Sequence, residues 1–330
     1  MKKIFALLLS AALLVTLLAA CGGGNTTDTD TDTQEPAADA STTHVEEQEP
    51  DTGDASKDDP LNQDEIGEKE LLVVSFGTSY NDSRRETIGA IEKAMQTAFP
   101  DYSVRRAFTS QIIIDHVKDR DGVTIDNVEQ ALERAVNNGV KTLVVQPTHL
   151  MNGLEYEELT DELAKYSDSF EKIAIGDPLL TSDADFEAVM TAITDATKDA
   201  ADGKTAICFM GHGTTADSNS VYSKMQTLLT DKGFNDYYVG TVEATPSLDD
   251  VLAAVQKGNY EKVILRPLMI VAGDHANNDM AGDEDDSWKS TFEKAGYTVD
   301  CQVEGLGQLE AIQQLFVEHA KAAVASAEAE

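Results

Sequence analysis

Alternation of apolar runs with helical patterns, present in both halves of the chain, constrains the fold most strongly. Each apolar run has strand length and is followed by a loop and a segment with helical periodicity. The runs lie at residues 71–76, 104–108, 141–146, 172–175, 205–210, 237–242, 262–269 and 298–303. This order predicts parallel sheets joined by right-handed helical crossovers. We expect an α/β fold with two Rossmann-like lobes that face each other across a cleft.

The two halves also match in local sequence, which indicates a structural duplication. Residues 74–78 correspond in position to 209–214, and residues 144–149 correspond to 264–269. Neither first strand is followed by a glycine-rich dinucleotide motif or a P-loop, so no nucleotide cofactor is expected.

The residues before the first apolar strand differ in composition from the rest. Residues 1–21 have a basic start, an apolar stretch and Leu-Ala-Ala before Cys21, which predicts a secretory signal with a lipidated Cys21. A plain signal peptide or an uncleaved anchor is the alternative. Residues 22–69 have almost no large apolar side chains, which predicts a disordered acidic tether. The lobes are then expected at residues 70–200 and 201–330.

These features predict an exported protein that is lipid-anchored at the cell envelope, in the periplasm or on the outer face of the cytoplasmic membrane. No other stretch is long and apolar enough to span a bilayer, so a lipid would be the only membrane attachment. A formal net charge of −35 argues against nucleic-acid binding. The composition is compatible with a homo-oligomer.

Three metal-compatible side chains follow strands of the second lobe, namely His212, Glu243 and His275. Ligand sites in open α/β sheets lie outside the carboxyl ends of the strands. Two imidazoles and one carboxylate suit a divalent first-row metal. Each residue also has a structural alternative. His212 could be a loop histidine bonded to a backbone carbonyl, Glu243 a helix-capping carboxylate, and His275 part of a capped turn.

The first lobe carries candidates for binding a substrate in the cleft. His149 ends the third strand and could contact a substrate or transfer a proton, although a structural role is equally open. The scarce arginines include the pair Arg105-Arg106. Because arginine pairs with carboxylates in a bidentate manner, this pair could hold a polycarboxylate ligand, with surface ion pairs as the alternative. An acidic run at residues 279–286 either begins a helix or attracts cations.

Several of these motifs together resemble the anaerobic cobalt chelatases of the CbiK type. The resemblance covers about residues 70–323 and rests on a long stretch, residues 267–280, that contains Gly273-Asp274-His275. Shorter matches lie at residues 72–80, 106–110, 210–213 and 242–243.

The resemblance implies a class II chelatase, a lyase that inserts a divalent metal into a tetrapyrrole without ATP. The implied reaction is Co²⁺ insertion into sirohydrochlorin on the anaerobic path to cobalamin, with Fe²⁺ and Ni²⁺ as alternative metals. The implied metal ligands are His212, Glu243 and His275, with His212 also as the catalytic base. The expected tetrapyrrole contacts are Ser79, Tyr80, Arg105, Arg106 and His149.

Two other functions remain open from the sequence. One is a non-catalytic envelope lipoprotein that binds a tetrapyrrole or a metal for uptake. The other is a two-lobed solute-binding protein, which the complete set of metal ligands disfavours. In the chelatase interpretation the divalent metal is a substrate and the tetrapyrrole is the partner. The membrane would be contacted only through the lipid.

Overall fold

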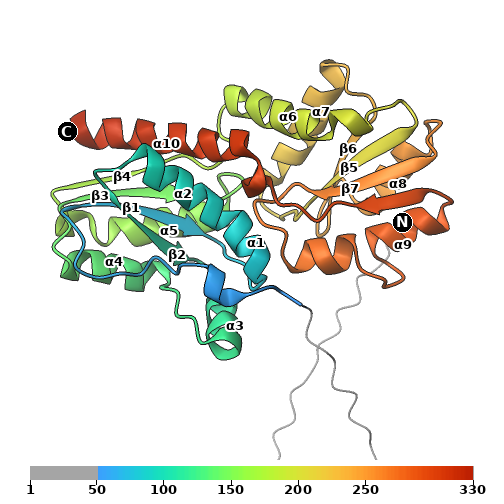
Figure 1. The fold of residues 1–330 in the computed structure, drawn as a ribbon. Coiled ribbons are helices and arrows are strands. Elements are labelled where there is room, and N and C mark those ends of the chain that lie inside the picture. Colours follow the sequence, from blue (N-terminus) through green and yellow to red (C-terminus); the bar gives the residue numbers. More distant parts are fainter. Residues whose placement is uncertain (1–50, 330) are drawn as a thin grey trace, which may run out of the picture. The chain divides into compact units, whose positions relative to one another are not determined.

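A computed structural model describes residues 51–329 (Figure 1). The predicted signal, the lipidated Cys21 and residues 22–50 of the predicted tether lie outside the described residues. Among residues 51–329, no helix combines the length and apolar character that crossing a membrane requires.

Two four-stranded parallel sheets form the framework and confirm the predicted α/β fold. The first sheet has the order β2-β1-β3-β4 and the second has the order β6-β5-β7-β8. The two orders are equivalent, as the predicted duplication requires. The strands are β1 (Lys69–Ser75), β2 (Ser103–Phe108), β3 (Thr142–Pro147), β4 (Lys172–Ile175), β5 (Thr205–Gly211), β6 (Tyr237–Thr241), β7 (Lys262–Pro267) and β8 (Thr298–Cys301).

Helices connect successive strands, and several begin at side-chain caps that the sequence supplies. Asn127, Ser182 and Ser247 each form a reciprocal capping box with the third residue of the following helix. The helices are α1 (Asn81–Glu86), α2 (Ile88–Ala98), α3 (Gln111–Asp121), α4 (Val128–Asn137), α5 (Leu154–Ala164), α6 (Asp183–Thr197), α7 (Ser220–Asp231), α8 (Leu248–Val255), α9 (Trp288–Lys294) and α10 (Glu310–Ala329).

Helices α6 and α10 differ from the expected division into residues 70–200 and 201–330. Figure 1 shows α10 extending over the first sheet. There Ala323 and Ala327 pack against Val144 of β3, and Lys172 of β4 donates to the carbonyl of Ala327 at 2.8 Å. Helix α6 instead packs beside α7. The residue boundary therefore separates the sheets but not their covering helices.

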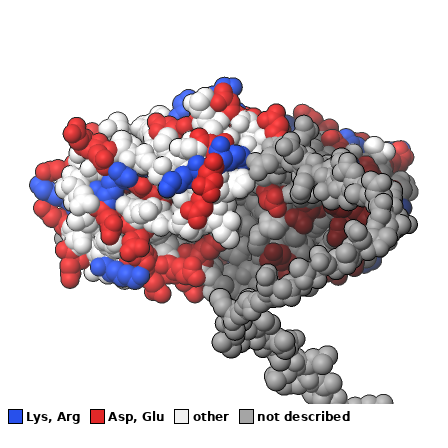
Figure 2. Space-filling view, turned by 90° about the horizontal axis from the view of Figure 1, so that it is seen from below, with Lys and Arg blue, Asp and Glu red and all other residues white. Residues whose placement is uncertain are grey.

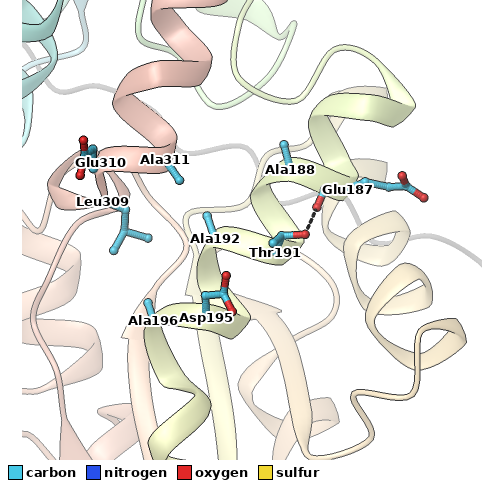
Figure 3. A pocket seen from close by; sticks show the side chains of 9 residues that line it. All are labelled: Glu187, Ala188, Thr191, Ala192, Asp195, Ala196, Leu309, Glu310 and Ala311. Carbon is cyan, nitrogen blue, oxygen red and sulfur yellow. Dashed lines mark hydrogen bonds between the residues drawn. The ribbon is translucent and has the colours of Figure 1, made fainter.

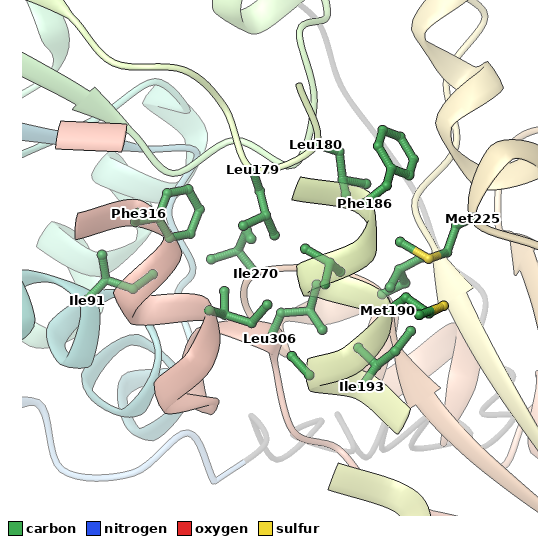
Figure 4. Close-up of a cluster of buried hydrophobic side chains, with 14 of the residues drawn as sticks. Ile91, Leu179, Leu180, Phe186, Met190, Ile193, Met225, Ile270, Leu306 and Phe316 are labelled. Atoms are coloured by element: carbon green, nitrogen blue, oxygen red, sulfur yellow. The ribbon is translucent and has the colours of Figure 1, made fainter. Parts of the chain in front are cut away.

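One apolar cluster joins the two halves (Figure 4). Ile91 of α2 and Phe316 of α10 belong to it, as do Phe186 of α6 and Met225 of α7. Because apolar side chains close-pack, such a shared core holds the helices around both sheets in one unit.

The segment at residues 51–68 differs from the predicted disordered tether. It runs beside the edge strand β2, where the amide of Arg106 donates to the carbonyl of Leu61 at 3.1 Å and Gln63 donates to the carbonyl of Val104 at 3.3 Å. Leu61 is buried, and Asp58 forms buried ion pairs with Arg84 and Arg106. A few such side chains stabilise a segment whose average composition is typical of disorder.

The surface is predominantly acidic, in accordance with the composition. Figure 2 shows acidic side chains spread over much of the visible face, with basic side chains between them. A cavity of about 620 Å³ lies between α6 and the start of α10 (Figure 3). Its lining includes alanines of α6 and Leu309, and it includes none of the metal or tetrapyrrole candidates. The cavity is thus separate from the chemistry at the strand ends.

Candidate metal centre

The metal candidates follow three neighbouring strands of the second sheet. His212 comes directly after β5, and Glu243 comes two residues after β6. His275 follows β7 and precedes η5 (Ala276–Met280), a short π-helical turn. Since the carboxyl ends of parallel strands meet at one edge, these loops bring the three side chains together.

The three side chains converge closely enough to share one ion. One ligand atom from each of His212, Glu243 and His275 lies within 4.8 Å of the others. The two imidazole rings are edge-on, with centroids 4.6 Å apart and an interplanar angle of 86°. His212 and Glu243 are exposed and His275 is partly buried, so the cluster is open to solvent on one side. Three protein ligands with an open side are typical of a site where a metal reacts.

Hydrogen bonds orient both imidazoles toward the cluster. The Nδ1 of His212 donates to the carbonyl of Gly213 at 2.8 Å, because a carbonyl can only accept. The Nδ1 of His275 lies 2.8 Å from a carboxylate oxygen of Asp279. With each Nδ1 carrying a proton, each Nε2 keeps its lone pair for a metal or a proton. The π-helical turn brings Asp279, four residues further on, to His275.

Loops of the first sheet lie against this cluster. Thr78 lies so close to Gly273 that a Cβ added there would be 3.1 Å from the Thr78 hydroxyl. Gly153, before α5, lies beside Ser218 in the same way. Tyr80 interacts electrostatically with Asp274, and burial is the largest cause of its raised pKa. The structure thus brings the loop of Ser79 and Tyr80 next to His275.

A family model described as cobalt chelatase (CbiK) matches residues 69–325. The chain belongs to this family. It is 38% identical over 251 residues to the sirohydrochlorin cobaltochelatase of Salmonella typhimurium, covering 76% of this chain and 94% of the relative. It is 30% identical over 260 residues to sirohydrochlorin cobaltochelatase CbiKC of Nitratidesulfovibrio vulgaris, covering 78% and 91% respectively.

Solved structures support the same fold. SirB from Bacillus subtilis with Fe³⁺ aligns with a TM-score of 0.57 at 14% identity, over 80% of this chain and 98% of SirB. A SirB complex with cobalt from Bacillus subtilis subspecies spizizenii aligns with a TM-score of 0.54 at 15% identity, over the same shares. At these identities the likeness shows a shared fold and no more.

His149 is placed at the end of β3, as the sequence predicts, but its surroundings are unusual. The side chain is almost fully buried, and neither ring nitrogen has a hydrogen-bond partner among residues 51–329. Burial lowers the pKa of His149 to about 4, so the ring is neutral near pH 7. A neutral imidazole with both nitrogens unsatisfied can donate one hydrogen bond to a substrate and accept another from it.

Glu155 is a candidate site residue that sequence reasoning misses. Its carboxylate lies 3.6 Å from the Nε2 of His149. Burial raises the pKa of Glu155, and the neighbouring His212 imidazole partly opposes this rise. Glu155 therefore lies beside His149 and also interacts with His212 of the metal cluster. The sequence could not single it out, because Glu157 and Glu158 follow in the same helix.

Arg105 and Arg106 are not placed as predicted, since both are fully buried in β2. Arg105 pairs with Glu70 and Asp126, and Arg106 pairs with Asp58 and Glu92. Their guanidinium groups are occupied inside the first lobe, so the predicted contact with a polycarboxylate ligand is wrong for this pair. Arg105 and Arg106 point to opposite faces of the first sheet. Helix α4 covers the face with Arg105, and α2 with residues 51–68 covers the face with Arg106.

Proposed function

We propose that the chain is a sirohydrochlorin cobaltochelatase, which inserts Co²⁺ into the tetrapyrrole without nucleotide hydrolysis. The observation that carries the proposal is the convergence of His212, Glu243 and His275 at the carboxyl edge of the second sheet. Membership of the CbiK family and the curated names of two relatives support the same activity. Fe²⁺ and Ni²⁺ are alternative metal substrates for the same ligand set.

The ligands first hold the metal while leaving part of its coordination sphere open. The Nε2 atoms of His212 and His275 and the carboxylate of Glu243 replace water around Co²⁺. The open side of the cluster lets pyrrole nitrogens enter and displace the protein ligands in turn. Asp279 keeps the His275 ring in position during this exchange, because its carboxylate accepts a hydrogen bond from Nδ1–H of that ring.

Insertion also requires the removal of two pyrrole protons. His212 is the first acceptor in our proposal, because its Nε2 lone pair becomes free once a pyrrole nitrogen has displaced Nε2 from the metal, while Nδ1 stays bonded to the carbonyl of Gly213. Glu155 is the next acceptor in our proposal, because its carboxylate lies 3.6 Å from the Nε2 of His149 and burial raises its pKa. His149, held neutral by burial, can then bond to Glu155 or to the macrocycle.

We also propose that this chelatase is exported and lipid-anchored through Cys21. The proposal is supported by the basic start, the apolar stretch and the Leu-Ala-Ala-Cys sequence that ends it. This N-terminal sequence also favours a second candidate function, a non-catalytic envelope lipoprotein that binds tetrapyrrole or metal for uptake.

Turnover separates the two candidates. The protein would be mixed with a tenfold excess of sirohydrochlorin and Co²⁺ under anaerobic conditions, and insertion would be followed by absorbance. Cobalt sirohydrochlorin formed well beyond one equivalent per protein supports the enzyme. Formation or binding that stops at one equivalent supports the binding protein.

A further inference from the structure

Large apolar side chains that remain exposed are few in the described part of the chain, and three of them follow strands of the first sheet. Within residues 51–329 they are Phe76, Ile112, Val136 and Leu154, with exposed fractions of 47%, 82%, 40% and 57%. Exposed apolar side chains that gather in one place usually mark a contact surface.

Three of the four follow neighbouring strands of the first sheet at the carboxyl edge. Phe76 comes directly after β1, Ile112 lies in the first turn of α3 after β2, and Leu154 begins α5 after β3. The order β2-β1-β3 places Phe76 between the other two. Strands are about 4.8 Å apart, so the ends of β2 and β3, on either side of β1, lie roughly 10 Å apart. This span is comparable with the breadth of a ring of four pyrroles.

The duplication relates Phe76 of the first lobe to the metal ligand His212 of the second lobe. Phe76-Gly77 follows β1 as His212-Gly213 follows β5, and both glycines have positive φ angles, of 102° and 90°. The same backbone turn therefore presents an aromatic ring in one lobe and a metal ligand in the other.

The loops that carry the apolar side chains also border the metal centre. Gly153, next to Leu154, lies beside Ser218 of the loop that follows His212. Thr78, two residues after Phe76, lies beside Gly273. Ser110, two residues before Ile112, donates its amide to the carbonyl of Phe76 at 3.3 Å.

We infer that Phe76, Ile112 and Leu154 form an apolar platform that holds one face of the tetrapyrrole while the second lobe presents the metal. A tetrapyrrole has apolar faces and charged groups on its edge, so a flat apolar support suits its face. The aromatic ring of Phe76 adds stacking to the burial of apolar area. This inference rests on the proposed chelatase function and names the residues through which the enzyme would recognise the macrocycle.

The experiment is a titration of metal-free sirohydrochlorin, followed by absorbance, against the full-length protein and five variants. Phe76→Ala, Ile112→Ala and Leu154→Ala remove the platform side chains. Val136→Ala is the matched control, because Val136 is similarly exposed but lies near the end of α4, where the chain enters β3 at the opposite edge of the sheet. Circular dichroism verifies folding, and a separate Co²⁺ titration measures the metal centre.

We expect Phe76→Ala, Ile112→Ala and Leu154→Ala each to weaken tetrapyrrole binding about tenfold, from the apolar area that no longer becomes buried. Co²⁺ affinity should be unchanged in all three, and Phe76→Leu should restore most of the binding that Phe76→Ala loses. Val136→Ala should bind like the wild type.

Several results would overturn the platform. One is wild-type tetrapyrrole affinity in Phe76→Ala and Leu154→Ala, and another is an equal loss in Val136→Ala. A third is a wild-type dimer that Phe76→Ala dissociates without any change in tetrapyrrole affinity, because the patch would then be an interface between copies. Failure of the proposed function is distinguishable, since in that case the wild type itself neither binds sirohydrochlorin nor inserts Co²⁺.

Discussion

Loss of Arg106 should destabilise the fold rather than weaken ligand binding. Its guanidinium makes two hydrogen bonds of 2.7 Å to Glu92 and two of 2.7 and 3.0 Å to Asp58. All three side chains are nearly inaccessible to solvent. Arg106→Met would leave Glu92 buried without a partner, whereas Asp58 would keep its 2.6 Å bond to Arg84.

The expected cost is about 3–5 kcal/mol of unfolding free energy, the range for removing one partner of a buried ion pair. Urea unfolding followed by circular dichroism would measure it. Arg85→Ala is the control, because Arg85 is 30% exposed and pairs with exposed carboxylates, so its loss should cost at most about 1 kcal/mol. The double variant Arg106→Met/Glu92→Met should recover much of the lost stability, since apolar groups then replace both charges.

Tetrapyrrole affinity provides the second readout for the same variants. At a temperature where Arg106→Met is still folded, its sirohydrochlorin affinity should equal that of the wild type. An unfolding free energy within about 1 kcal/mol of the wild type, together with weakened tetrapyrrole binding, would refute this reasoning and restore the arginine to the ligand site.

Three further predictions concern other parts of the chain. His149 has a pKa of about 4 in the folded state, below its ordinary value of 6.5. Between these pH values the unfolded chain binds a proton that the folded chain does not, so stability falls as the pH drops from 6.5 to 4. His149→Gln should reduce this loss of stability by about 3 kcal/mol in urea unfolding, and an unchanged pH dependence would contradict the assignment. Asp279→Asn should weaken Co²⁺ binding about ten- to a hundredfold by equilibrium titration, because the His275 ring loses its charged acceptor, and wild-type affinity would count against that role. Cys21→Ala should move the protein from the membrane fraction to the soluble fraction, and retention after signal cleavage would disprove the lipid anchor.

Much of the fold follows from the sequence, because parallel buried strands leave long apolar runs. The strand ends follow as well, and with them His212, Glu243 and His275, since each stands just beyond such a run. The helix α10 was harder to place, because an amphipathic pattern shows that a helix has a buried face but not which sheet covers it.

The polar partners inside the protein could not be predicted from local sequence. Arg105 and Arg106 are adjacent in a strand, so their side chains point to opposite faces of the sheet. Both are buried, because Glu70 and Asp126 pair with Arg105, while Glu92 of α2 and Asp58 of residues 51–68 pair with Arg106. Glu155 is identified only by its distance to His149, across a loop whose shape the sequence does not specify.

The most direct test of the central claim is Co²⁺ insertion into sirohydrochlorin by single replacements of the metal ligands. His275→Ala, His212→Ala and Glu243→Gln change exposed or partly exposed loop residues, so the fold should be retained and circular dichroism would verify it. We predict that all three lose most insertion activity and that His275→Ala binds Co²⁺ much more weakly, while metal-free sirohydrochlorin still binds. Near-wild-type insertion by folded His212→Ala or His275→Ala would contradict the chelatase mechanism and favour the binding protein.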